Sequence, residues 1–287
     1  MIPRAIYNAK QNQLCSIDRF CTSIDLTRDA YYKMCKRNNQ QVLVKEAVLK
    51  FVLERRKDLP REGGRKLLKS ITKSLIDNHI QFGRDRLFDL LRENSLLVRP
   101  KKRYIRTTNS WHRFHKYPNL IKNISISRPN QVWVSDITYI RLIKGHCYLA
   151  LITDAYSRKI VGFDLSDSLE LAGCIRALKR ALKQLPADNK LIHHSDRGIQ
   201  YCSNMYVGLL KKKNIEISMT EENHCYENAI AERVNGILKD EFFLDQSFKY
   251  ITHAKDVCKN AIKLYNNKRL HLSLDYKTPN IVHKIVA

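Results

Sequence analysis

Three runs rich in β-branched and aromatic residues, placed at hairpin spacing, constrain the fold of this 287-residue chain more than any other feature. They read QVWVSDITYIRL from Gln131, HCYLALITDAYS from His146 and RKIVGFDLS from Arg158. Runs of this kind predict three antiparallel strands. The pattern then predicts a helix over 167–185, a strand over 190–196, a helix near 204–213, a strand over 215–219, and helices over 225–242 and 252–266. This order predicts an α/β fold, a mixed sheet with helices on its faces.

The first hundred residues predict helices rather than strands. Apolar residues recur at helical spacing over 42–59, 63–79 and 83–94, and Pro60 ends the first of these helices. Residues 16–36 are a fainter candidate for a helix-turn-helix. Pro100 then suits the start of another helix, where eight residues contain no acid and five cations: Arg99, Lys101, Lys102, Arg103 and Arg106. Short helices of which the last is basic predict a DNA-binding helix-turn-helix. The alternative is a plain helical bundle with a solvated basic face.

The chain is long enough for two domains, each with its own core. Helical periodicity is lost over 109–127, which indicates a linker. The sequence therefore predicts a helical DNA-binding region over 1–108, a linker over 109–127 and an α/β core over 128–287.

The net charge indicates a polyanionic partner. Lys and Arg number 52 against 28 Asp and Glu, which gives a formal net charge of +24. Such a charge attracts nucleic acid. Non-specific stickiness and an anionic membrane surface are the alternatives, but the sequence has no basic amphipathic helix with an aromatic opposite face.

The location of the protein is predicted by what the sequence lacks. It has no apolar run long enough to span a bilayer and no apolar segment typical of a secretory signal. The eight cysteines form no CxxC pair, which predicts buried thiols rather than a zinc site or a disulfide framework. We therefore expect a cytoplasmic, nucleoid-associated protein with no membrane partner.

The helix predicted over 225–242 has two opposed faces. At about 100° per residue, an apolar stripe is formed by Ile230, Val234, Ile237 and Leu238. Four polar residues lie in a row on the opposite side: Asn228, Glu232, Asn235 and Lys239. The stripe predicts packing on a core, whereas the row, taken alone, favours a solvated face.

Three acids lie at positions that suggest a functional role for their carboxylates. Asp136 lies in the middle of a predicted strand on the same face as Val134, which is costly without a cation or hydrogen-bond donors. Asp196 ends the predicted strand KLIHHSD, where α/β sheets tend to place their sites, and Glu232 belongs to the polar row. Together they supply the oxygen ligands that two Mg²⁺ ions take in phosphoryl transfer. Each acid alone favours a cap, turn or salt bridge, and Asp154 is best interpreted as a hairpin-turn residue.

Four motifs give the chain a specific resemblance: QVWVSDITYI, HHSDRGIQYCS, NHCYENAIAERVNGILKDE and YNNKRLHLSLDYKTP. They resemble the catalytic core of bacterial insertion-sequence transposases, in particular the second-frame (OrfB) protein of the insertion-sequence-three family, relatives of retroviral integrase. The resemblance covers roughly 128–283 and, less tightly, the helical half. It implies a ribonuclease-H-like fold with a five-stranded mixed sheet flanked by helices. It maps the family's DDE acid triad onto Asp136, Asp196 and Glu232, and a basic residue seven positions later onto Lys239.

The resemblance also implies a reaction and its partners. The triad would hold two Mg²⁺ or Mn²⁺ ions, cleave at the ends of an insertion sequence and join the 3′-OH ends to DNA. The polar row would then face the metals and the DNA end, so that Lys239, Asn228 and Asn235 contact DNA together with the cations of 99–106. The implied partners are the terminal inverted repeats, target DNA, further copies of the chain and an upstream-frame fusion partner.

Two other functions compete with this interpretation. Another ribonuclease-H-fold nuclease would need neither the basic helical half nor Lys239. A non-catalytic DNA-binding regulator derived from a transposase is the second rival, and the intact triad argues against it. Departures from the family pattern concern packing or end recognition: Glu227 stands where Asp is usual, His224 where a smaller polar residue is common, and Leu270 where Pro is usual.

Overall fold

The structure, a computed structural model, describes residues 16–98, 113–186, 190–221 and 228–285. The chain divides into two compact units, one formed by Met1–Arg55 and Ser70–Leu97 and the other by Arg56–Lys69 and Val98–Ala287. The division differs from the predicted domain limits in residues 56–69 and at Val98, which the sequence assigns to the helical region but which belong to the second unit. Helical periodicity identifies a helix and leaves open which core it joins.

Helices precede the sheet: α2 (Ile17–Ser23), α3 (Arg28–Asp58), α4 (Gly64–Asp77) and α5 (Arg84–Glu93). The helices predicted over 63–79 and 83–94 are confirmed as α4 and α5. The helix predicted over 42–59 is only the second half of α3. α3 begins earlier because Thr27 caps it, accepting a hydrogen bond from the Ala30 N–H at 3.2 Å, and because the helix contains neither glycine nor proline.

The second unit is built on a five-stranded mixed sheet in the order β3-β2-β1-β4-β5. The strands are β1 (Val132–Arg141), β2 (His146–Asp154), β3 (Ile160–Ser166), β4 (Ile192–Ser195) and β5 (Glu216–Met219). β1, β2 and β3 are antiparallel neighbours, whereas β4 pairs with β1, and β5 with β4, in parallel. Each strand lies within the run that predicted it. The order and directions are those of the ribonuclease-H-like fold, so the predicted fold class is confirmed.

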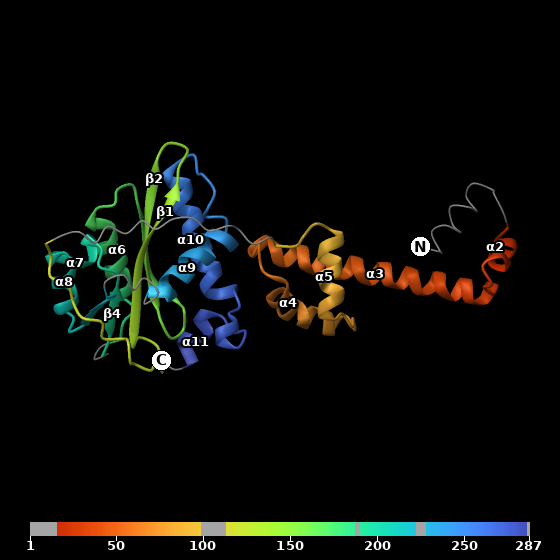
Figure 1. Ribbon diagram of the computed structural model, residues 1–287, viewed down its shortest axis with the longest axis horizontal. Coiled ribbons are helices and arrows are strands. Elements are labelled where there is room, and N and C mark those ends of the chain that lie inside the picture. Colours follow the sequence, from red (N-terminus) through yellow and green to blue (C-terminus); the bar gives the residue numbers. More distant parts are fainter. Residues whose placement is uncertain (1–15, 99–112, 187–189, 222–227, 286–287) are drawn as a thin grey trace. The chain divides into compact units, whose positions relative to one another are not determined.

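Helices cover both faces of this sheet (Figure 1). One face carries α6 (Leu171–Leu182), α7 (Ile199–Cys202) and α8 (Asn204–Lys211), and the other carries α9 (Ala229–Glu241), α10 (Ile251–Lys268) and α11 (Pro279–Ile285). Alternate residues of β2 serve the two layers, since successive strand residues point to opposite faces. Ala150 and Ile152 pack in the core that includes α6 and α8, and Leu149 and Leu151 in the core of α9 and α10. None of the described helices is both long and apolar enough to traverse a bilayer.

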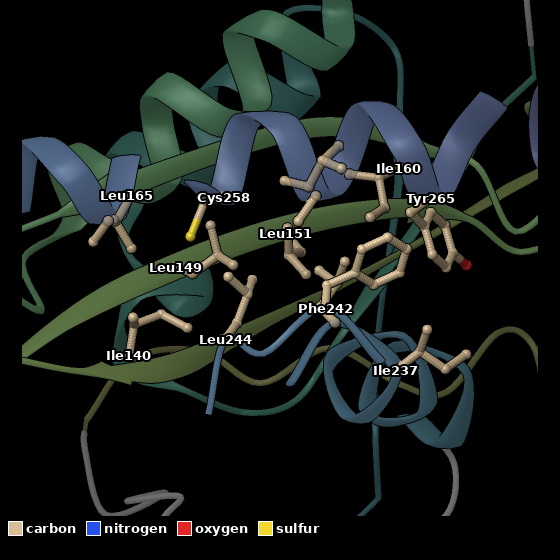
Figure 2. Close-up of a cluster of buried hydrophobic side chains, with 14 of the residues drawn as sticks. Ile140, Leu149, Leu151, Ile160, Leu165, Ile237, Phe242, Leu244, Cys258 and Tyr265 are labelled. Carbon is tan, nitrogen blue, oxygen red and sulfur yellow. The ribbon is translucent and has the colours of Figure 1, made fainter. Parts of the chain in front are cut away.

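Figure 2 shows the core on the α9 and α10 side of the sheet. Leu149 and Leu151 of β2 and Ile160 of β3 belong to one buried cluster with Ile237 of α9 and Cys258 of α10. The predicted apolar stripe of α9 therefore packs on the core. Five of the cysteines in the described ranges are buried free thiols, as the sequence predicts. The packing fixes the rotation of α9 about its own axis and hence decides which of its residues face β1.

The β2–β3 turn is closed by Asp154, as the sequence predicts. The Asp154 carboxylate is fully buried and accepts hydrogen bonds from the backbone N–H groups of Asn130 and Ser157, both at 2.7 Å. The Ser157 hydroxyl donates to the same carboxylate at 2.6 Å and lies 3.0 Å from Nδ1 of His283. This cluster ties α11, a helix that the sequence did not predict, to the hairpin.

The described part of the predicted linker packs on the sheet edge. Residues 113–127 contain neither helix nor strand. The Met219 N–H of β5 donates to the Pro118 carbonyl at 3.3 Å, and the Leu120 N–H donates to the Ser218 hydroxyl at 2.9 Å. This segment therefore belongs structurally to the second unit.

Candidate active site

Asp136 and Asp196 follow neighbouring, paired positions of two parallel strands. β1 and β4 pair in register up to Ser135 opposite Ser195, and each aspartate is the next residue of its chain. Adjacent strands lie about 4.8 Å apart, so this single pairing brings the two acids together although 59 residues separate them in sequence. β4 ends at Ser195 while β1 continues. The two carboxylates therefore lie at the carboxyl end of β4, beside the middle of β1.

The half-buried carboxylate of Asp136 is held by two donors. The Ile137 N–H donates to its Oδ1 at 2.9 Å, and Nδ2 of Asn235 in α9 donates to its Oδ2 at 2.6 Å. Burial, followed by the negative charge of Asp196, raises the pKa of Asp136 to about 7, and Glu232 adds a smaller effect in the same direction. The two hydrogen bonds oppose this rise. A carboxyl group whose ionisation is opposed by neighbouring acids is typical of a functional site.

Asp196 is positioned by the turn that follows β4. The Gly198 N–H donates to Asp196 Oδ1 at 3.0 Å, in an Asx-type turn that leads into α7. A Cβ atom on Gly198 would lie 3.0 Å from the same oxygen. Glycine suits this position because a side chain would press on the carboxylate.

Glu232 lies in the first turn of α9, and its side chain is exposed. α9 rests against β1, where Ala231 packs in one cluster with Val134 and Asn235 reaches Asp136. Glu232 is close enough to Asp136 to raise its pKa. The structure therefore places Asp136 and Asp196 at neighbouring positions of β1 and β4, and Glu232 on the helix that packs against β1.

The donor set at this end of the sheet fits a hard divalent cation. In the described ranges no three or more His, Cys, Asp and Glu side chains are already spaced as a metal site. The chemistry of the donors is nevertheless suitable, because Mg²⁺ and Mn²⁺ take carboxylate and amide oxygens. Asn235 Oδ1 is a further oxygen here, buried and without a hydrogen-bond partner in the described part of the chain. A bound cation would also offset the repulsion that raises the pKa of Asp136.

The polar row of α9 is not one uniform surface. Asn228 and Asn235 are buried, Lys239 is half-buried and Glu232 is exposed. Asn228 Nδ2 donates to the Ser135 carbonyl at 3.1 Å. The two amides thus fasten α9 to β1 on either side of Glu232, rather than forming the solvated face that the pattern alone favours. DNA contact by either amide stays a prediction.

Lys239 lies within electrostatic reach of the acids. Burial lowers the pKa of Lys239, and the charge of Asp136 partly restores it. The ammonium group thus stands beside the candidate metal site. The remaining predicted DNA contacts lie outside the described residues, as does the basic helix predicted to follow Pro100: Arg99, Lys101, Lys102, Arg103 and Arg106.

A buried network beside the acids was not anticipated from the sequence. Nε2 of His193 in β4 lies 2.7 Å from the Ser135 hydroxyl and 3.0 Å from the Tyr206 hydroxyl. Burial, followed by the neighbouring His194, lowers the pKa of His193 to about 3, so its ring is neutral. The motif KLIHHSD showed a histidine in the strand before Asp196, but only the strand pairing reveals its partner.

Two models of the family described as integrase core domain match the chain, over residues 126–225 and 213–279. The first span contains Asp136 and Asp196, and the second contains Glu232 and Lys239. The matches therefore cover every acid of the candidate site.

Similar proteins come from bacterial insertion elements. The uncharacterized 31 kDa protein of insertion element IS600 of Shigella sonnei is 37% identical over 209 residues, which are 71% of this chain and 76% of that protein. The transposase for insertion sequence element IS904 of Lactococcus lactis is 37% identical over 172 residues, 58% of this chain and 67% of that protein. The transposase InsF for insertion sequence IS3A of Escherichia coli is 32% identical over 183 residues, 63% of this chain and 64% of that protein.

Proposed function

We propose that this chain, which belongs to the bacterial insertion-sequence transposases that carry an integrase core domain, cuts and joins DNA with Asp136, Asp196 and Glu232. Its function is DNA transposition, which makes it a polynucleotidyl transferase. The observation that carries the proposed chemistry is the adjacency of Asp136 and Asp196 on β1 and β4, with Glu232 near enough to act on the Asp136 carboxyl.

The three acids would hold two Mg²⁺ or Mn²⁺ ions. When bound, such a pair activates the attacking oxygen and stabilises the leaving oxygen of an in-line phosphoryl displacement. The protein prepares the ligands beforehand: Asn235 and the Ile137 N–H orient the Asp136 carboxylate, and the Gly198 N–H orients Asp196. Burial and the charge of Asp196 raise the pKa of Asp136, and a bound cation would lower it again because it favours the ionised carboxylate.

The reaction would have two steps with the same geometry. First, water attacks a phosphodiester at the end of the element, which frees a 3′-OH and leaves a 5′-phosphate on the other fragment. Next, that 3′-OH attacks a phosphodiester of another DNA segment, forming one P–O bond and breaking one. Lys239, beside Asp136, would contact a phosphate of the terminal DNA and hold the strand in line.

DNA is the substrate of this family, and the finer partners are part of the proposal. The helical region and the five cations of 99–106 would bind the terminal inverted repeats, largely through phosphate contacts that weaken as salt rises. Cutting and joining two ends of an element would bring several copies of the chain together on DNA. An upstream reading frame would supply a fusion partner.

The acid triad is tested by Asp136→Asn. This change keeps the shape of the side chain but removes its charge, so we expect cleavage of a labelled repeat end in Mg²⁺ to be lost, with DNA affinity within about twofold of the wild type. The matched control is Asp167→Asn, on an exposed residue before α6, which should cleave normally.

Two results would count against this assignment. Cleavage by Asp136→Asn at the wild-type rate removes this carboxylate from the chemistry. Equal loss of cleavage and DNA binding, with both variants folded, makes it a structural residue instead. A wild-type chain that binds repeat ends and never cleaves them, with or without Mg²⁺, supports the regulator.

A further inference from the structure

A cavity of about 620 Å³ lies on the side of α9 that faces away from Asp136. Its walls are formed by α9, the loop before α4, and the 3₁₀ turn η2 (Leu272–Leu274) with the residues just before it. All of these belong to the second unit. Part of the motif YNNKRLHLSLDYKTP, to which the proposed reaction assigns no role, thus forms one wall of the cavity. The volume is within the range of cavities that hold small organic ligands.

The lining of this cavity is strongly basic. Two acidic side chains, Asp240 and Glu241, face five basic ones: Arg61, Lys66, Arg158, Arg233 and Arg269. Glu241 is already engaged by two of these cations, Lys66 Nζ at 2.9 Å and Arg269 Nη2 at 2.7 Å. Asp240 is the other acid of the lining, beside the guanidinium groups of Arg61, Arg158 and Arg233, and Asp154 acts on Arg158 from outside it. The excess of positive charge favours an anionic ligand.

Two buried nitrogens of the lining lack partners. Nη1 of Arg158 and Nε2 of His271 are buried without a hydrogen-bond partner among the residues that the structure describes, and a buried polar atom left unpaired is costly. The Arg158 backbone has φ +63° and its carbonyl accepts the Tyr265 hydroxyl at 2.9 Å, so the residue is fixed in an unusual conformation. Burial lowers the pKa of His271 to about 2, and the positive charges of Arg269 and three other cations of the lining add to this lowering.

The rest of the lining suits the uncharged part of a ligand. Ile230 and Val234 of α9 and Leu272 of η2 present apolar surface. Ala229, the first residue of α9, also lines the cavity, so the positive end of the helix dipole opens on it. A ligand that fits has an anionic group joined to a less polar body.

We propose that this cavity binds a nucleotide of a DNA strand, with the phosphate against Arg158 and Arg233 and the sugar or base against the apolar wall. The inference rests on the proposed function, because DNA is that reaction's substrate, and it adds a contact on the face of α9 opposite the acids. The net charge of +24 favours a polyanion over an acidic peptide. The chain's own segment 99–108 follows Val98, which lines the cavity, but it has five cations and no acid, so its charge opposes insertion.

The test measures the affinity of the full chain for a fluorescent DNA duplex over a range of salt concentrations. The variants are Arg158→Met, which keeps the length of the side chain, and Arg233→Gln, on an exposed residue of α9. We expect each to bind about tenfold more weakly and to lower the salt slope by about one. The matched control is Lys259→Gln on the exposed side of α10, away from the cavity, which should stay within about twofold.

Several outcomes would overturn the inference. If both cavity variants keep the wild-type DNA affinity, salt slope and melting temperature, the cavity does not bind DNA. Inorganic phosphate, or a polyglutamate peptide, that raises the melting temperature of the wild type but not of Arg158→Met, while DNA affinity is unaffected, would assign the cavity to that ligand instead.

Failure of the proposed reaction is distinguishable from failure of the cavity. The cavity variants should bind DNA more weakly and with a smaller salt slope, whereas Asp136→Asn should keep the affinity and salt slope of the wild type and not cleave. If the wild type never cleaves but the cavity variants bind DNA more weakly than it does, the cavity proposal stands and the acid triad is rejected.

Discussion

Asn235 shows how a single side chain can be placed correctly by sequence while its hydrogen-bond partner stays unpredicted. The helical pattern put it in a row with Glu232 and Lys239, and the row was expected to face DNA. In the structure its amide donates to Asp136 Oδ2 at 2.6 Å and is 5% exposed. Asn235 is therefore a positioning residue for the carboxylate. The sequence alone could not reveal this, because the partner lies on a strand 99 residues away.

Removal of the amide should weaken metal binding. We expect Asn235→Ala to need about 10–100-fold more Mg²⁺ for half-maximal cleavage, since groups that orient metal ligands have effects of this size. DNA affinity should stay within about twofold, and Asn260→Ala, on the exposed side of α10, serves as the control. An unchanged Mg²⁺ requirement in a folded Asn235→Ala variant would contradict the positioning role.

His193 should make the second unit sensitive to acid. Burial, followed by His194, lowers its pKa to about 3 from an ordinary 6.5. A depressed pKa means that the neutral ring contributes fully above about pH 6.5 and that its contribution is lost as the pH falls toward about 3. Between about pH 7 and about pH 5 the wild type should therefore lose about 2 kcal/mol more free energy of unfolding than His193→Gln, measured in urea. Equal losses in the two proteins would show that His193 is not the acid-sensitive group.

At the scale of elements, local patterns predicted the strands well. Each of the five strands falls within its predicted run, because β-branched residues bounded by turns are a local signal. α3 was predicted too short, since its first half is largely exposed and the polar run over 36–41 interrupts its apolar pattern. The pairing of β1 with β4 could not be predicted in the same way, because register depends on contacts distant in sequence. Residue types thus identified the candidate acids and suggested that they could share metal ions, and the resemblance gave the three acids their family roles.

Glu241 joins three elements through buried charges. It accepts hydrogen bonds from Lys66 near the start of α4 and from Arg269 just after α10. Burial alone would raise the pKa of Glu241, but Arg269 and Lys66 outweigh it and lower the pKa. Glu241→Gln removes the carboxylate that is hydrogen-bonded to two buried cations, so we expect the free energy of unfolding in urea to fall by about 3 kcal/mol. Glu216→Gln, exposed on β5, is the control. If Glu241→Gln lowers the free energy of unfolding no more than this control does, the buried ion pairs do not stabilise the fold.

At the scale of the whole molecule, the two units share the chain in an interleaved order. Residues 56–69 lie between segments of the first unit but pack with the second. Leu59 is 1% exposed and belongs to the cluster on the α9 and α10 side of the sheet. A point mutation outside the family-matched spans should therefore disturb the catalytic sheet.

Leu59→Ala tests this division of the chain. We expect it to cost the second unit about 3 kcal/mol, because it opens a cavity in the core, and to speed amide hydrogen exchange in β2 and α10. The matched control is Leu87→Ala, buried in α5 of the first unit, which should act on α5 instead. Faster exchange in α5 and not in β2 after Leu59→Ala would refute the assignment.

Between Asp136 and Asp196 the chain makes a detour through β2, β3 and α6 before it returns beside the strand it left. Insertions or deletions in the exposed loops of this connection can change its length without moving either acid, because the pairing of β1 with β4 holds the two residues side by side. Loss of one residue inside β1 ahead of Asp136 would instead turn its carboxylate to the opposite side of the sheet. The proposed site should thus tolerate changes in the length of these connections but not a shift in strand register.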